Sequence, residues 1–140
     1  MIVSCRSCAK PNRLPAARLN DRARCASCKS PLLPVEHPIA IGSTADFDEL
    51  MRDAPGPVLV DFWATWCPPC RIVAPELEKL AAERVGRLVT AKVDTDALSE
   101  VAGRYGIRSV PTLILFREGR EVKRISGAMP AAAIAAQLSV

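Results

Sequence analysis

The sequence predicts an α/β domain of three layers around a central mixed sheet, preceded by a small cysteine-rich module. Strand and helix patterns alternate from residue 39 to the end of the chain, which indicates such a layered domain. All six cysteines fall in three C-x-x-C units, two before residue 30 and one inside the alternating pattern. Three prolines separate these regions and deny them a continuous helix. We therefore expect a module at residues 1–30, a linker at 31–38 and a domain at 39–140.

The composition is that of an ordinary globular protein, with 140 residues, 49% hydrophobic and 24% charged. The net charge of +4 is uneven. The first 36 residues hold seven basic and two acidic side chains, whereas the remainder holds twelve and thirteen. No stretch resembles a signal peptide or approaches the roughly 20 apolar residues of a membrane span. We expect a cytoplasmic protein without a membrane partner, in which clustered cysteines bind metal or perform redox chemistry.

Apolar runs of strand length alternate with helical periodicity through the domain. The predicted strands span residues 39–41, 58–63, 88–93, 112–116 and 121–126. The predicted helices span residues 45–52, 70–85, 95 or 96 to 105, and the alanine-rich stretch from residue 130. The run at 58–63 is almost continuously apolar, as expected of a central strand covered on both faces. It leads directly into the third C-x-x-C unit.

Single residues mark where the predicted helices begin and bend. Ser43 or Thr44 is expected to cap the first helix, and Thr95 or Asp96 the third. Pro75 removes one internal hydrogen bond from the second helix and should bend it. The apolar face of this second helix is predicted to contain Ile72, Val73, Leu77, Leu80 and Ala81.

Cys67 and Cys70 lie between the central strand and the second helix. Backbone N–H groups and the positive end of a helix dipole stabilise a thiolate at such a first cysteine. The two-residue spacing lets the second sulfur attack a mixed disulfide and release the reduced substrate. We expect Cys67 to be exposed and to attack, and Cys70 to resolve. Inert core cysteines or half of a metal site are the alternatives, and the strand before and the helix after disfavour them.

The segment from Asp61 to Arg71, DFWATWCPPCR, resembles the active-site segment of thioredoxins. The resemblance covers residues 39–140 and includes, beyond this segment, Pro75, Lys92-Val93-Asp94, Val110-Pro111-Thr112 and Gly127. It implies a thioredoxin-like fold and the reduction of disulfides in protein substrates. It also implies that an NADPH-dependent flavoprotein, thioredoxin reductase, restores the dithiol, and that the chain itself binds no organic cofactor.

The resemblance assigns Asp61 as a buried carboxylate that helps proton transfer to and from Cys70 through water. Burial would raise the pKa of Asp61 towards neutrality, which suits a proton carrier. Without the resemblance, a strand-end Asp satisfied by a cap is the simpler interpretation. Trp63 is expected to pack beside the site.

The resemblance also implies a substrate surface around Cys67. Val110 and Pro111 would be joined by a cis peptide that faces the disulfide, with the backbone of Val110 pairing with a bound substrate strand. Trp66 and Gly127 would help to form a flat apolar surface for an extended substrate segment.

Pro68 departs from the family pattern, because thioredoxins usually have glycine at this position. Pro68 and Pro69 lack two N–H donors near the Cys67 sulfur, which weakens thiolate stabilisation, while their rigidity preorganises the helix start. These effects oppose each other. The redox potential therefore stays open, and with it a disulfide oxidase or isomerase as an alternative function.

The four remaining cysteines have the spacing C-x2-C-x16-C-x2-C, which lets four thiolates surround one Zn²⁺. The predicted ligands are Cys5, Cys8, Cys25 and Cys28. Zinc with four thiolates carries a net charge of −2, which nearby Arg6, Arg24 and Lys29 can balance. The whole chain resembles the zinc-containing bacterial thioredoxins of the second type, which have such a site before the thioredoxin domain.

Three alternatives remain for this module. Two structural disulfides would use the same cysteines. A basic nucleic-acid-binding module is disfavoured because residues 1–38 contain no aromatic side chain for base stacking. A redox-responsive zinc-binding interaction module, which loses metal on oxidation, is the third. His37 is expected to be a linker residue, since four cysteines complete the site.

Overall fold

The computed structural model describes all 140 residues and contains a five-stranded mixed sheet in the order β5-β7-β6-β8-β9. The strands are β5 (Ile39–Ala40), β6 (Val58–Trp63), β7 (Val89–Asp94), β8 (Thr112–Arg117) and β9 (Arg120–Ser126). The first three of these run parallel to one another, β8 runs antiparallel to β6, and β9 runs antiparallel to β8. The predicted order of strands and helices is confirmed.

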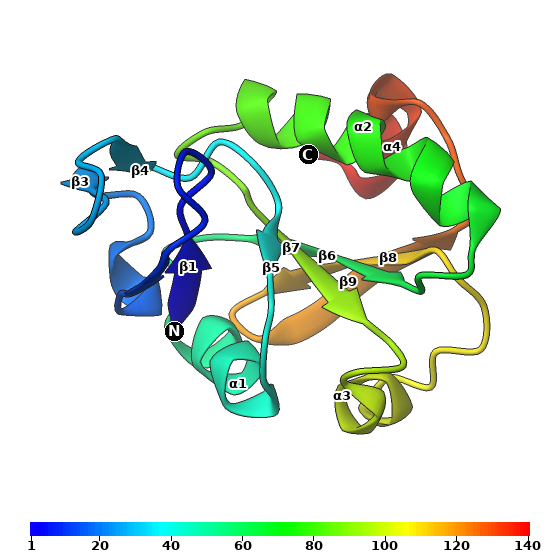
Figure 1. Cartoon of the computed structure of the whole chain (residues 1–140). Helices are drawn as coiled ribbons and strands as arrows, with labels where there is room; N and C mark the ends of the chain where they lie inside the picture. The colour runs from blue at the N-terminus through cyan, green and yellow to red at the C-terminus, as the bar shows by residue number, and fades with distance from the viewer.

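Two pairs of helices cover the two faces of the sheet (Figure 1). They are α1 (Thr44–Asp53), α2 (Pro68–Glu83), α3 (Ser99–Arg104) and α4 (Ala131–Leu138). Figure 1 shows α2 and α4 on one face and α1 and α3 on the other. Successive side chains of the central strand β6 alternate between these faces, so that Val58 and Val60 join the core beside α1 while Leu59 joins the core beneath α2 and α4. No helix has the length and apolar character that crossing a membrane requires.

The start of α3 differs from the prediction. The helix begins at Ser99, and neither Thr95 nor Asp96 caps it. Thr95 instead donates its N–H and its hydroxyl to the carbonyl of Trp63, at 2.9 and 3.0 Å. The Asp94 carboxylate accepts the N–H groups of the two residues that follow Thr95, which folds this segment into a turn. The first helix, by contrast, has the predicted cap, because Ser43 Oγ accepts an N–H from the first turn at 3.1 Å.

The N-terminal module consists of two antiparallel hairpins. Its elements are β1 (Ile2–Ser4), β2 (Pro11–Arg13), the 3-10 helix η1 (Ala16–Arg18), β3 (Ala23–Arg24) and β4 (Pro31–Leu33). Each hairpin carries one C-x-x-C unit in its turn. Strand β4 is formed by the first three residues of the predicted linker, and a proline at the start of a strand is compatible with pairing. The Leu33–Pro34 peptide that ends it is cis.

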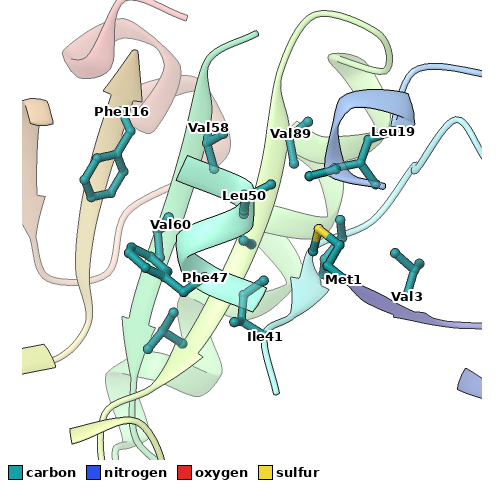
Figure 2. Packing of buried hydrophobic residues seen from close by; sticks show 14 of the residues in the cluster. Met1, Val3, Leu19, Ile41, Phe47, Leu50, Val58, Val60, Val89 and Phe116 are labelled. Atoms are coloured by element: carbon teal, nitrogen blue, oxygen red, sulfur yellow. The ribbon is translucent and has the colours of Figure 1, made fainter. Parts of the chain in front are cut away.

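The module and the domain share one hydrophobic core. Figure 2 shows Met1, Val3 and Leu19 beside Ile41 and Leu50, and all five belong to one cluster of buried side chains. Polar contacts reinforce this junction. The Glu49 carboxylate on α1 accepts hydrogen bonds from the α-amino group of Met1 and from the N–H of Ala16, each at 2.8 Å. The module is therefore packed against α1 and the β5 edge of the sheet.

Candidate active site and candidate metal centre

Cys67 and Cys70 are joined by a disulfide at the start of α2, with their Cα atoms 5.3 Å apart. Cys67 is the N-cap of this helix, and its sulfur accepts the N–H of Cys70 at 3.2 Å. Pro68 and Pro69 fill the first two helical positions and have no N–H to offer. The sulfur of Cys67 thus lies at the positive end of the helix dipole, as the sequence predicts.

The predicted exposure of Cys67 is wrong for this disulfide-bonded form. Cys67 is only 2% exposed and Cys70 4%. The Cys67 sulfur lies 3.6 Å from the carbonyl oxygen of Val110, and both cysteines cluster with Ala64 and the partly buried Trp63. The family resemblance indicated that Val110 faces the disulfide, whereas the local pattern around Cys67 did not indicate that the sulfur would be covered.

Two loops meet beside the disulfide. The Val110–Pro111 peptide is cis, as the resemblance implies. The carbonyl of Pro111 accepts the N–H of Gly127 at 3.0 Å, which joins the loop before β8 to the end of β9. Gly127 has φ of +90°, a conformation that side chains disfavour. The structure therefore brings Val110, Pro111 and Gly127 together, and Val110 against Cys67.

An exposed apolar surface borders the disulfide. Trp66 is 65% exposed, and Pro68 and Pro69 are exposed beside it. The Trp66 indole N–H donates to the Asp96 carboxylate at 2.9 Å, a contact that the sequence did not reveal because the residues are 30 positions apart. Ile72 is 63% exposed, so its predicted place on the buried face of α2 is wrong. Its neighbours Val73 and Leu77 do lie on that face, and Ile72 turns outward near the active site.

Asp61 is completely buried, and neither of its carboxylate oxygens has a hydrogen-bond partner. Alternation along β6 places it on the same face as Leu59, which is the face that α2 covers. Burial raises the pKa of Asp61 to about 7, and the charge of Lys92, its register partner on β7, opposes this rise. The predicted burial and the direction of its effect on the pKa are confirmed.

The sulfur atoms of the four module cysteines form one cluster, in which all lie within 4.8 Å of one another. The pairs Cys5–Cys28 and Cys8–Cys25 each have sulfurs 3.6 Å apart, and none of the four is in a disulfide. A tetrahedral zinc site with Zn–S bonds of about 2.3 Å has S···S edges of about 3.8 Å. The residues present therefore fit Zn²⁺, and they do not form the two disulfides that were the alternative.

The surroundings shift the pKa values of Cys25 and Cys8 in opposite directions. The backbone N–H of Cys28 and, more weakly, the Asn12 amide lower the pKa of Cys25 to about 6, against the opposing effect of burial. A hydrogen bond from the backbone of Lys10 lowers the pKa of Cys8, but burial and the neighbouring sulfurs together outweigh it and raise the pKa to about 11. Crowded thiolates repel one another, so a divalent cation that neutralises them is favoured.

Comparison with known proteins agrees with this geometry. Residues 38–140 match the family model described as thioredoxin, and residues 4–30 match a zinc-ribbon model described as thioredoxin 2, N-terminal. Fold and site together define a thiol–disulfide oxidoreductase. The chain belongs to the thioredoxin family, and its activity is dithiol–disulfide exchange with disulfide-containing proteins. Together, the zinc-ribbon match and the clustered cysteines point to zinc binding.

Similar proteins come from several branches of life. Thioredoxin C-3 of Corynebacterium nephridii is 39% identical over 129 residues, which cover 92% of this chain and 87% of that protein. A thioredoxin of Mycobacterium tuberculosis strain H37Rv is 55% identical over 83 residues, 59% of this chain and 72% of the relative. Among solved structures, a single-substitution mutant of a thioredoxin from Halobacterium salinarum has a TM-score of 0.65 at 34% identity, covering 71% of this chain and 85% of its own. Thioredoxin NaTrxh from Nicotiana alata has a TM-score of 0.67 at 30% identity, covering 74% and 91%.

Proposed function

We propose that Cys67 is the attacking sulfur and Cys70 the resolving sulfur in the reduction of protein disulfides. The thiolate of Cys67 displaces one sulfur of the substrate disulfide, which leaves and takes a proton, and a mixed disulfide forms. Cys70 then loses its proton and attacks Cys67 Sγ, and the second substrate sulfur leaves. Two electrons pass from the dithiol to the substrate. The observation that carries this proposal is the capping position of Cys67, whose sulfur receives the N–H of Cys70.

Asp61 is the group that exchanges a proton with Cys70 in this scheme, through water. A pKa of about 7 leaves comparable amounts of acid and carboxylate at neutral pH, which is the condition for efficient proton transfer in both directions. Its position on the α2 side of β6 and the absence of a competing hydrogen-bond partner support this role.

An extended substrate segment is proposed to lie on the apolar surface around the disulfide. Trp66, Pro68 and Pro69 would supply exposed contact area, and the backbone of Val110 would pair with the segment. Pro111 and Gly127 would hold that loop in place through their hydrogen bond of 3.0 Å.

The electron donor is proposed to be an NADPH-dependent thioredoxin reductase in the cytoplasm, as family membership implies. The four free cysteines of the module are consistent with a reducing compartment. These cysteines would hold one structural Zn²⁺ per chain, and no organic cofactor would be bound. Matches at residues 4–30 and 38–140 support the division into a module, a linker at 31–38 and a domain, although β4 extends the folded module to Leu33.

The assignment of the two sulfurs is tested with Cys67→Ser, Cys70→Ser and the neighbouring control Thr65→Ser. Each variant is mixed with a protein disulfide and a thioredoxin reductase, and substrate reduction and covalent adducts are followed. We expect no reduction with Cys67→Ser, an accumulating mixed disulfide with Cys70→Ser, and the wild-type rate with Thr65→Ser. A Cys67→Ser variant that reduces the substrate at the wild-type rate, or an adduct formed through residue 70, contradicts the assignment.

The same protein can be equilibrated with a glutathione buffer to decide between a reductase and an oxidase. A reduction potential of about −270 mV for the Cys67–Cys70 pair is typical of a reductase, whereas one of about −120 mV is typical of a strong oxidant. The second value would overturn the direction of electron flow proposed above.

A further inference from the structure

Asn12 is a buried polar side chain that the catalytic site does not use. It lies at the centre of β2 and is only 7% exposed. Its amide reaches from the first hairpin of the module to the second. Oδ1 accepts the N–H of Ala26 at 3.0 Å, and Nδ2 donates to the carbonyl of Lys10 at 3.2 Å and lies 3.6 Å from the sulfur of Cys25.

These three contacts link both turns that carry the metal-binding cysteines. Lys10 follows the C-x-x-C unit of the first hairpin, and Ala26 lies inside the unit of the second. A single amide group therefore fixes the position of one turn relative to the other. A separation of 3.6 Å suits an N–H donor and sulfur, whose radius is larger than that of oxygen.

The contact between Asn12 Nδ2 and the sulfur of Cys25 also affects the charge of the site. Zn²⁺ with four thiolates has a net charge of −2, and beside the buried Cys25 such excess charge is stabilised by a nearby hydrogen-bond donor. An N–H group that donates to a thiolate offsets part of this negative charge and orients the thiolate. Residues that hydrogen-bond to metal ligands commonly have this function in metal sites. Asn12 can provide this with a neutral side chain that satisfies a backbone N–H at the same time.

We propose that Asn12 is a positioning residue for the metal centre, whose amide orients the Cys25 thiolate and ties the two cysteine turns together so that the site retains its ion. This inference rests on the proposed zinc site but not on the redox chemistry of Cys67 and Cys70. Loss of such a partner typically weakens metal binding by about 10- to 100-fold.

The test compares Asn12→Asp with Asn20→Asp. The first keeps the oxygen that accepts from Ala26 but replaces the N–H donor at Cys25 with an acceptor. The second makes the same chemical change at an exposed site in the module, where Nδ2 donates only to the carbonyl of Gly86 at 3.2 Å. Zinc content, competition with a chromophoric chelator, and the rate of disulfide reduction are measured for the full chain.

We expect Asn12→Asp to bind zinc about 10- to 100-fold more weakly, Asn20→Asp to stay within about twofold of wild type, and both to reduce disulfides normally. Equal zinc affinity in Asn12→Asp and wild type, or equal losses in both variants, overturns the role of Asn12. A wild-type chain without zinc affinity overturns the zinc site itself, and intact disulfide reduction keeps that outcome distinct from failure of the redox assignment.

A measurement on the wild-type protein covers the case in which Asn12→Asp does not fold. With ¹¹³Cd in the site, an N–H···S contact transmits a scalar coupling from the metal to the amide proton. We expect a correlation between ¹¹³Cd and a side-chain amide proton of Asn12, and none for Asn20. Its absence at Asn12, with the backbone correlations of the same site visible, overturns the proposal.

Discussion

Replacing Asp61 with asparagine should stabilise the disulfide-bonded protein at neutral and alkaline pH. The carboxyl group is buried without a hydrogen-bond partner, and its pKa is raised to about 7 from an ordinary value of 3.8. Above that pH the folded protein must hold a buried, unpaired negative charge. Asparagine has nearly the size of the protonated acid and is neutral throughout, so the variant removes the charge and little else.

The magnitude follows from the two pKa values. The difference between 3.8 and about 7, at about 1.4 kcal/mol for each pH unit, corresponds to about 4 kcal/mol. Between pH 3.8 and about 7, Asp61 binds more protons in the folded protein than in the unfolded protein. Its contribution to the free energy of unfolding of the wild type therefore falls as the pH rises through this range. Well below a pH of 3.8 both states are protonated and the penalty vanishes. The advantage of Asp61→Asn should therefore grow from near zero in acid to about 4 kcal/mol at about pH 8.

Denaturant unfolding of the oxidised, metal-loaded protein at several pH values measures this difference directly. Asp21→Asn is the matched control, because Asp21 is exposed and paired only with Arg18 at 2.7 Å. Its effect should be below about 1 kcal/mol at every pH. A stability gain of Asp61→Asn that does not change with pH, or a loss at alkaline pH, would refute the argument from burial.

Three further predictions concern packing and surface contacts. Leu19→Ala empties a site that is 1% exposed in the shared core, and should lower the free energy of unfolding by about 2 to 5 kcal/mol in denaturant titrations; a loss below about 1 kcal/mol would contradict the shared core. Arg6→Ala breaks the half-exposed ion pair with Glu78, so the free energy of unfolding should fall by less than about 1 kcal/mol, and by less still with added salt. A large decrease that does not depend on salt would contradict the weak contribution expected of this ion pair. Asp96→Ala frees the Trp66 indole and should raise KM for a protein disulfide about 2- to 10-fold while leaving the rate with a small disulfide unchanged; equal effects on both substrates would argue against a substrate surface.

The sequence predicted the redox pair well because its determinants are local. An apolar strand, a C-x-x-C unit and a helical pattern follow one another within about 25 residues, so chain connectivity alone places Cys67 at a helix start. The clustering of Cys5, Cys8, Cys25 and Cys28 was predictable because the spacing of the two C-x-x-C units is the one that lets four thiolates surround one ion. The role proposed for Asp61 came from the family resemblance and not from the local pattern.

The surroundings of the pair were less predictable because they come from distant segments. Nothing local to Trp66 indicates the carboxylate of Asp96, and nothing local to Cys67 indicates the Val110 carbonyl that covers it. Ile72 was misplaced for a different reason. Helical periodicity identifies an apolar face, but it does not tell whether an apolar residue at the edge of that face turns inward or remains exposed next to a functional surface.

The N-terminal module shows how counting apolar residues within one segment can mislead. Taken alone, residues 1–38 contain too few large apolar side chains to offset the entropy of ordering them without a covalent or metal crosslink. In the structure Met1 and Leu19 are buried against residues of the domain, including Leu50 on α1, and Glu49 satisfies backbone donors of the module. Apolar burial at this junction stabilises both parts at once, so loss of the ion should loosen the cysteine turns before it separates the module from the domain. With the proposed zinc bound, the free energy that holds the module in place is divided between sulfur ligation at one end and the shared core at the other.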